Sequence, residues 1–381
     1  MFDLRKKVSN NLVNLSGWTT TRKIIVIESD DWGSLRMPNT ETYNALLNDG
    51  IPVNKSPYCQ FDNLCSIQDL EMLFGVLKNH KDSQGNHPMI TANVVVANPD
   101  FSKIKNAHFS EYYYETIATT FENFFPTANP LNLWKEGYHE QLFFPQFHGR
   151  EHVNVPFWLN LLKNNDSVFI RAFEHHCWGI STDVYNKYPK SVQASFDYNH
   201  ESELTFMKES LVDGLDIFEN LFGYRSESFT PNNYIWPEQL NEVLSQNGIT
   251  SMQGMKYQLL PKPIGTVKRE KVRRFNGQLL GQNKTLLQMV RNVQFEPSLL
   301  SEPEKNGVVN DCLSQIQTAF FWKKPAIISM HRINFCGTLH EENRNENLIK
   351  LNQLLIEVKK RWPDVEFLDS VTLSKIIKET P

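Results

Sequence analysis

Residues 23–31 read Lys-Ile-Ile-Val-Ile-Glu-Ser-Asp-Asp, which joins an apolar run directly to an acidic pair. Residues 24–27 are four consecutive β-branched side chains, which favour the pleated conformation and leave no polar face for a helix. We therefore expect a buried strand over 23–30. Asp30 and Asp31 then lie where this strand ends.

Similar apolar runs recur along the chain and alternate with stretches of helical period. Strands are expected over 89–97, 141–147, 167–173, 228–230, 249–254, 285–293, 326–330 and 365–368, and helices over 151–162, 201–222, 237–246, 309–321 and 346–361. An alternation repeated seven or eight times predicts a parallel sheet covered by helices, and the count favours a closed or nearly closed barrel. We expect one barrel domain over 1–381, with insertions at about 36–86, 101–138 and 258–303.

Composition excludes several classes of protein. A formal charge of −4 gives no electrostatic footprint for nucleic acid. No apolar run is long enough to span a bilayer, and the basic N-terminal residues are not followed by the apolar segment of a secretory signal. Five scattered cysteines lack the close pairs of a zinc ribbon or a disulfide scaffold. A reducing cytoplasm is the expected compartment.

Polar side chains gather at or just beyond the expected strand ends, where barrel enzymes build their active sites. These side chains are Asp30, Asp31, His148, Glu174, His175, His176, Asn232, Asn233 and His331.

The spacing of His148 and His152 suggests metal binding. If residues 149–152 open a helix, the two imidazoles lie at i and i+4 on one face and can converge on one ion. The acidic pair is the obvious source of a third ligand, and the other carboxylate then stays free as a base. Taken alone, the acidic pair is typical of a solvated turn and the histidine pair of a helix surface. Their combination at strand ends favours a catalytic divalent ion with open positions for water.

Four motifs resemble those of the polysaccharide deacetylases, the NodB-like enzymes of the carbohydrate esterase family 4 type. They are Ser-Asp-Asp-Trp-Gly at 29–33, His-Gly-Arg-Glu-His at 148–152, Phe-Thr-Pro-Asn-Asn-Tyr at 229–234 and Ser-Met-His at 329–331. The resemblance implies a distorted (β/α)7–8 barrel of the glycoside hydrolase/deacetylase type. It also implies that Asp30 is the general base, that Asp31, His148 and His152 hold the metal, and that His331 is the general acid. Zinc is the expected ion, with nickel, cobalt and manganese as alternatives.

The chain departs from the family pattern at three points. Trp32 stands between the acidic pair and the glycine that usually follows it directly. Phe229 stands where the third motif usually carries an arginine that orients the base, and Arg36, Arg150 and Arg171 are the candidates to replace it. No acidic motif that supports His331 is recognisable.

Further residues near the expected barrel mouth are predicted to contact the substrate. They are Trp32, Arg150, Glu174, His176, Pro231, Asn232 and Trp236. Aromatic rings stack on sugars, although packing in the core is the common role of such residues. Glu174 and His176 fit a substrate site, a second ion site or a hydrogen-bonded rim.

The predicted function is a metal-dependent hydrolase that removes an acetyl group from a sugar or a glycan precursor. The bond is an amide, a carbon–nitrogen bond outside peptides, or an ester. One alternative is a metal-independent glycoside hydrolase that pairs Asp30 with another carboxylate such as Glu174. The other is a degenerate barrel that binds glycans without catalysis.

Overall fold

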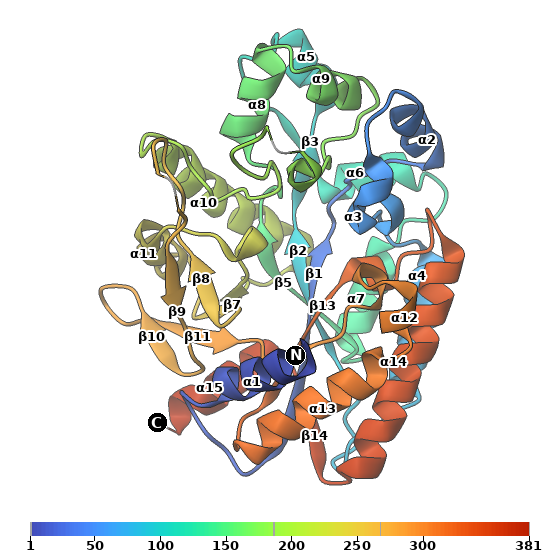
Figure 1. Cartoon of the computed structure of the whole chain (residues 1–381), viewed down its shortest axis with the longest axis vertical. Helices are drawn as coiled ribbons and strands as arrows, with labels where there is room; N and C mark the ends of the chain where they lie inside the picture. Colours follow the sequence, from blue (N-terminus) through green and yellow to red (C-terminus); the bar gives the residue numbers. More distant parts are fainter. Residues whose placement is uncertain (1, 186, 267, 381) are drawn as a thin grey trace.

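The computed structural model describes residues 2–185, 187–266 and 268–380. Within them ten strands form one central sheet (Figure 1). These strands are β1 (Lys23–Trp32), β2 (Ile90–Val95), β5 (Phe143–Gly149), β6 (Ser228–Phe229), β7 (Ser251–Gly254), β10 (Gln278–Leu280), β11 (Leu286–Val290), β12 (Val293–Gln294), β13 (Ala326–His331) and β14 (Val365–Leu368). Two antiparallel pairs lie outside it, β3 (Ala97–Pro99) with β4 (Tyr114–Thr116) and β8 (Tyr257–Leu259) with β9 (Lys271–Arg273).

The central sheet is mainly parallel and returns onto itself. Its order is β10-β11-β7-β6-β5-β2-β1-β13-β12, with β14 added beside β1, and the pairing of β10 with β11 is antiparallel. Only Arg291 and Asn292 separate β11 from β12, so the two sides of the sheet meet on one continuous piece of chain. The predicted fold class, a distorted α/β barrel, is confirmed. Strands β11 and β12 lie within residues 258–303, one of the regions expected to be an insertion.

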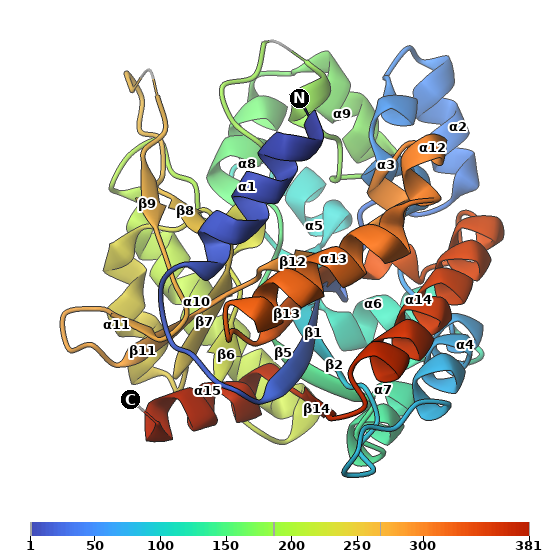
Figure 2. The same ribbon diagram turned by 60° about the horizontal axis from the view of Figure 1, so that its bottom comes forward.

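Helices cover the outside of the sheet (Figures 1 and 2). They are α1 (Phe2–Asn14), α2 (Thr40–Asn48), α3 (Pro57–Phe61), α4 (Ile67–Lys78), α5 (Phe101–Asn106), α6 (Ile117–Phe124), α7 (Leu131–His139), α8 (Val155–Lys163), α9 (Ser167–Glu174), α10 (Glu203–Phe222), α11 (Asn241–Gln246), α12 (Glu302–Lys305), α13 (Val308–Phe321), α14 (Glu341–Arg361) and α15 (Ser370–Glu379). Short 3-10 helices are η1 (Val53–Lys55), η2 (Thr182–Val184), η3 (Asn232–Tyr234), η4 (Glu238–Leu240), η5 (Pro297–Leu299) and η6 (Arg332–Asn334). No helix in the described part of the chain has both the length and the apolar character to cross a membrane.

Two local predictions were wrong. Residues 167–173, expected as a strand, form helix α9, because the Asp166 carboxylate accepts hydrogen bonds from the backbone of Val168 and Phe169 and caps the helix. Residues 149–152 do not open a helix either. His148 lies in strand β5, which ends at Gly149, and α8 begins only at Val155.

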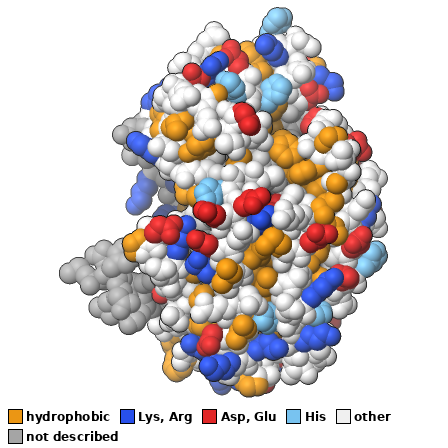
Figure 3. Space-filling view, turned by 90° about the vertical axis from the view of Figure 1, so that its right-hand side faces the viewer, with side chains coloured by type: hydrophobic (Ala, Val, Ile, Leu, Met, Phe, Trp, Pro, Cys, Tyr) orange, Lys and Arg blue, Asp and Glu red, His pale blue; other side chains and the backbone are white. Residues whose placement is uncertain are grey.

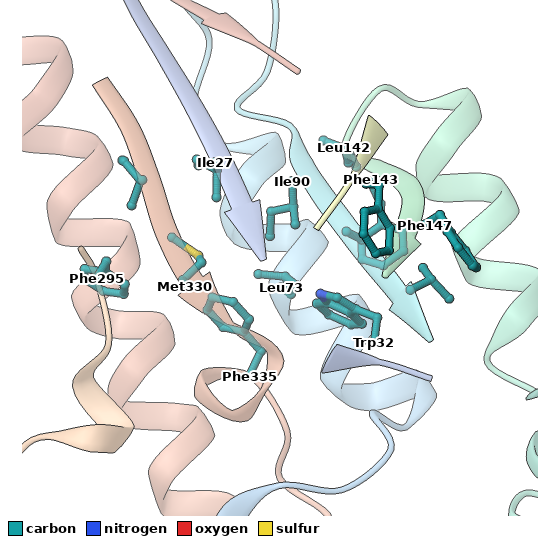
Figure 4. Close-up of a cluster of buried hydrophobic side chains, with 14 of the residues drawn as sticks. Ile27, Trp32, Leu73, Ile90, Leu142, Phe143, Phe147, Phe295, Met330 and Phe335 are labelled. Atoms are coloured by element: carbon teal, nitrogen blue, oxygen red, sulfur yellow. The ribbon is translucent and has the colours of Figure 1, made fainter. Parts of the chain in front are cut away.

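The barrel core is rich in aromatic side chains (Figure 4). Trp32 is fully buried and packs edge-on against Phe143, with 4.7 Å between ring centroids. Its indole nitrogen donates to Ser29 Oγ, which satisfies its polar group. On the face drawn in Figure 3, hydrophobic side chains are scattered among charged ones.

A second apolar cluster forms a cap over the carboxyl ends of β1, β2 and β5. Helices α2, α3, α5, α8 and α9 lie together at the top of Figure 1. Together with the loop after α9, which carries Trp178, they bury a set of side chains that includes Trp158 and Phe173, apart from the barrel core. The cap therefore adds a second apolar layer beside the strand ends.

Candidate active site and metal centre

A bulge at the end of β1 turns both acidic side chains toward one pocket. The pairing of β1 with β2 is regular up to Ser29 and shifts before Trp32. Between them Asp31 adopts a left-handed backbone with φ of 76°. In a regular strand adjacent side chains point to opposite faces, so the bulge is what lets Asp30 and Asp31 line the same space.

Asp31, His148 and His152 form a compact buried cluster. Asp31 Oδ1 lies 3.4 Å from His148 Nε2 and 3.0 Å from His152 Nε2. One ligand atom from each residue lies within 4.8 Å of the others. The convergence predicted from the sequence is present, although it arises from a strand end and the loop after it rather than from one helical face.

The donor chemistry of this cluster fits a divalent ion. His148 Nδ1 lies 2.6 Å from the Thr230 carbonyl oxygen, which can only accept, so Nδ1 carries a proton and Nε2 is the ring nitrogen that could bind an ion. A backbone carbonyl that fixes the tautomer in this way is a common support for metal-binding histidines. Two imidazoles and one carboxylate leave coordination positions open. These residues could therefore hold a catalytic ion.

Asp30 is held by Arg291, a residue that the sequence analysis missed. Arg291 Nη1 donates to Asp30 Oδ2 at 2.6 Å and Nη2 donates to Oδ1 at 2.7 Å, in a fully buried bidentate pair. Asn93 Nδ2 donates to the same carboxylate at 2.7 Å. Burial alone would raise the pKa of Asp30, but the charge and hydrogen bonds of Arg291 hold it well below its ordinary value.

The three arginines proposed to replace the missing motif arginine lie elsewhere. Arg150 pairs with Glu151 and Asp213, and Arg171 is a half-exposed residue beside Asp49. Arg36 pairs with Asp31 rather than with Asp30. Phe229 itself packs in the barrel core against Phe147. The orienting contact comes instead from the bend between β11 and β12. The signal for it was a charged residue directly after an apolar strand.

His331 has an acidic partner that was also missed. His331 Nδ1 lies 2.6 Å from Glu296 Oε1, and its Nε2 lies 3.9 Å from Asp30 Oδ2. Burial would lower the pKa of His331, but the Glu296 carboxylate outweighs this effect and raises it to about 9. Asn334 Nδ2 donates to the second oxygen of Glu296 and fixes it. His331 is therefore protonated at neutral pH.

These groups surround one pocket of about 270 Å³. It is lined by Asp30, Asp31, Arg36, Tyr58, His148, His152, Gln193, Pro231, Asn233, Tyr234 and His331. Asn233 and Tyr234 both have a positive φ, near 54° and 55°, which is costly for residues other than glycine. Local strain of this kind is common at ligand sites. Asn233 was expected at the barrel mouth, whereas Tyr58, Gln193 and Tyr234 were not named as site residues.

No protein-family model matches the sequence, and no curated protein matches it. Solved structures do match. A protein from Parabacteroides distasonis described as a glycoside hydrolase/deacetylase aligns with a TM-score of 0.51 at 6% identity, over 95% of this chain and 73% of that one. The chain has the glycoside hydrolase/deacetylase fold.

Two other matches are weaker. A protein from Pseudomonas aeruginosa PAO1 described as a polysaccharide deacetylase aligns with a TM-score of 0.47 at 9% identity, over 94% of this chain and 92% of that one. The PuuE allantoinase aligns with a TM-score of 0.45 at 10% identity, over 95% and 93%.

Most of the predicted substrate contacts lie away from the pocket. Of the seven, Pro231 lines it. Trp32 and Trp236 are buried in the core, and Asn232 is buried where it accepts a hydrogen bond from Ser195. Sequence periodicity could not separate core aromatics from pocket aromatics, because both follow strand ends.

The remaining three predicted contacts are engaged elsewhere. Arg150 lies over the ring of Tyr114, with 4.5 Å from its guanidinium carbon to the ring centroid. Glu174 is at the surface beside Arg171. His176 stacks on Phe101 and lines a different cavity of about 360 Å³.

Proposed function

We propose that this chain is a metal-dependent hydrolase that removes an acetyl group from a sugar or a glycan precursor. The observation that carries the proposal is the convergence of three supported groups on one pocket. Asp30 is fixed by Arg291, His331 is fixed by Glu296, and the cluster of Asp31, His148 and His152 lines the same pocket. A base, an acid and a metal cluster are what hydrolysis of an amide or ester requires.

Asp31, His148 and His152 would hold the ion. Zinc suits two imidazoles and a carboxylate, and nickel, cobalt and manganese accept the same ligand types. When bound, the ion would polarise the substrate carbonyl and make a water molecule more acidic.

The chain's own residues would carry the protons. Asp30 accepts the proton of the attacking water, and the two hydrogen bonds from Arg291 keep its carboxylate ionised and oriented. His331 donates its Nε2 proton to the leaving nitrogen or oxygen. Glu296, on the far side of the ring, keeps His331 charged at neutral pH. Base and acid therefore enter the reaction in opposite protonation states.

The pocket sets the scale of the substrate. A volume of about 270 Å³ is near the lower end for small-molecule sites, so it suits one acetylated sugar unit. Tyr58 and Tyr234 supply aromatic faces and hydroxyl groups for such a unit. Cytoplasmic location is part of the proposal, and the five cysteines, all free and buried, are compatible with it.

Acetate release tests the proposal. Protein loaded with zinc is incubated with a panel of N- and O-acetylated sugars, beside Asp30→Asn and the surface control Arg171→Met. We expect turnover in the wild type and the control, and a loss of about 10²-fold or more in Asp30→Asn. Saccharide binding without acetate release from any substrate, unchanged in Asp30→Asn, would instead identify a non-catalytic glycan-binding barrel.

The glycoside hydrolase alternative gains no support from the site. It requires a second carboxylate such as Glu174, and that side chain is exposed and paired with Arg171 outside the pocket lining. Cleavage of a glycosidic bond that persists in a chelator would nevertheless restore this alternative.

A further inference from the structure

The Arg36 guanidinium lies directly against the candidate metal ligands. Its Nη1 donates to Asp31 Oδ2 at 2.8 Å, and its Nη2 lies 3.0 Å from His152 Nε2. The side chain is buried, with an exposed fraction of 3%. A permanent cation therefore contacts two of the three residues that would hold a divalent ion.

The nitrogen of His152 that would bind the ion is also the atom that Arg36 contacts. His152 Nε2 is the ring nitrogen turned toward Asp31 Oδ1, 3.0 Å away, and it is also the atom that Arg36 Nη2 contacts. An arginine nitrogen can only donate, and it does not lose its proton in proteins. A metal ion needs the unshared pair of this imidazole nitrogen. One lone pair cannot accept a hydrogen bond from the arginine and bind the ion at the same time.

We propose that Arg36 and the divalent ion are alternative partners of His152, so that metal binding requires the Arg36 guanidinium to leave this nitrogen. The inference rests on the proposed function, because it takes Asp31, His148 and His152 as the ligands. Arg36 stabilises the charge of Asp31 when no ion is bound. It lowers the affinity for the ion by competing for His152 and by placing a like charge beside it.

Arg36 has contacts that survive such a movement. Its Nη1 donates to Asp62 Oδ2 at 2.6 Å, and its guanidinium carbon lies 5.0 Å from the centre of the Tyr58 ring. Neither residue belongs to the ligand cluster. Arg36 Nε has no hydrogen-bond partner among the described residues, so one donor is already uncommitted. The guanidinium can thus release His152 while it stays anchored in the pocket wall.

A purely supporting role predicts the opposite result. If Arg36 only orients Asp31 from behind, its removal weakens metal binding. If it competes with the ion, its removal strengthens binding. The sign of the change in zinc affinity therefore separates the two roles.

Arg332 provides a matched control. It is also a fully buried arginine on Asp62, with Nη2 to Oδ1 at 2.8 Å, but its other contact is the Ser34 carbonyl oxygen and not a ligand. Arg36→Met and Arg332→Met each remove one buried cation from the same carboxylate. Only Arg36→Met removes the contact with His152.

Zinc affinity is measured by competitive titration calorimetry at one pH on wild type, Arg36→Met and Arg332→Met, after circular dichroism confirms that each is folded. We expect the zinc Kd of Arg36→Met to fall by about tenfold or more and that of Arg332→Met to change much less. An unchanged or raised Kd in Arg36→Met overturns the inference. An equal fall in both variants also overturns it, since that result shows a general charge effect.

Crystal structures of the wild type with and without zinc give a second test that needs no variant. We expect the contact between Arg36 Nη2 and His152 Nε2 to be lost in the zinc form, and its retention beside a bound ion overturns the inference. If neither wild type nor Arg36→Met binds zinc, the metal chemistry of the proposed function fails as well. If the wild type binds zinc and Arg36→Met binds no better, only the role of Arg36 fails.

Discussion

The buried pair of Arg291 and Asp30 is the contact on which the proposed base depends. Arg291 also donates from Nε to Glu28 Oε2 at 2.6 Å, so Arg291→Met leaves two buried carboxylates without their cation. We expect the free energy of unfolding to fall by about 3–5 kcal/mol, as is usual when one partner of a buried ion pair is removed. Acetate release should fall by about 10²-fold or more. Urea unfolding and initial rates measure the two effects.

Arg171→Met is the control for Arg291→Met, because Arg171 is a half-exposed surface residue. It should leave both quantities nearly unchanged. Arg291→Met with wild-type turnover would show that Asp30 needs no orienting arginine.

Glu296 sets the alkaline limit of activity in the proposed mechanism. His331 must be protonated to act as the acid, and its pKa is about 9 because of Glu296. Activity should therefore fall as the pH rises through about 9. Glu296→Gln removes the charge that raises this pKa and should move the alkaline limb to lower pH. A kcat–pH profile of both proteins measures the shift, and an unmoved limb would mean that another group is the acid.

The raised pKa of His331 also makes the free energy of unfolding depend on pH. The pKa of His331 in the folded protein lies above its value of about 6.5 in the unfolded chain. Its contribution is therefore fully present below pH 6.5 and is lost as the pH rises through about 9.

Sequence reasoning placed the proposed base, acid and metal ligands on this pocket, namely Asp30, Asp31, His148, His152 and His331. It worked because each follows a strand or ends one, and parallel strands bring their carboxyl ends to one edge. It missed Glu296 because the strand before it, Val293–Gln294, has only two residues and no apolar run that would mark its end. It missed Arg291, which directly follows the apolar strand Leu286–Val290, because the strand expected over 285–293 ran past it.

At the scale of elements, the turn after β1 depends on a glycine in a crowded place. Gly33 has φ of +87°, and an added Cβ would lie 2.3 Å from the Val95 carbonyl oxygen. Gly50 has a similar φ of +79° but nothing within 4 Å of that position. Gly50→Ala should therefore lower the free energy of unfolding only by the cost of a left-handed backbone in alanine, about 1–2 kcal/mol. Gly33→Ala should cost at least about 3 kcal/mol, because backbone strain and a clash add.

Urea unfolding of the two glycine variants measures this difference directly. An equal loss of unfolding free energy in Gly33→Ala and Gly50→Ala would show that the chain beside Val95 moves away from the added Cβ without a free-energy cost. Zinc affinity adds a second readout, since Gly33 follows the strand end that carries Asp31. We expect it to weaken in Gly33→Ala alone.

Helix α9 shows why element type was harder to predict than element position. Phe169, Ala172 and Phe173 are buried at helical spacing, yet the same short apolar run also fits a strand. The deciding feature is the cap at Asp166, a local hydrogen bond that hydrophobic periodicity does not contain.

At the scale of the whole molecule, strand count predicted closure but not the way in which the barrel closes. β1 pairs with three strands, β2, β13 and β14, and its partners on β13 and β14 are some 300 or more residues away in the sequence. The barrel closes through the bend at Arg291 and Asn292, where Asn292 N donates to the Ile327 carbonyl oxygen. Arg291, which holds the proposed base Asp30, thus lies at the seam of the barrel, so the proposed catalysis would depend on the same bend as closure.

Metal removal is expected to affect the stability of the entire fold. Asp31 lies near the end of β1, His148 lies in β5 and His152 lies in the loop after β5, so an ion would connect separate parts of the barrel. An ion that binds only the folded state at 100 times its Kd adds about 2.7 kcal/mol to the free energy of unfolding. Chelation should abolish activity and lower the thermal midpoint, and zinc should restore both. In a His148→Ala, His152→Ala double variant, neither zinc nor chelator should move the midpoint, because the ligands are gone. A wild-type midpoint and turnover that are both insensitive to chelator would place the chemistry on Asp30 and His331 without an ion.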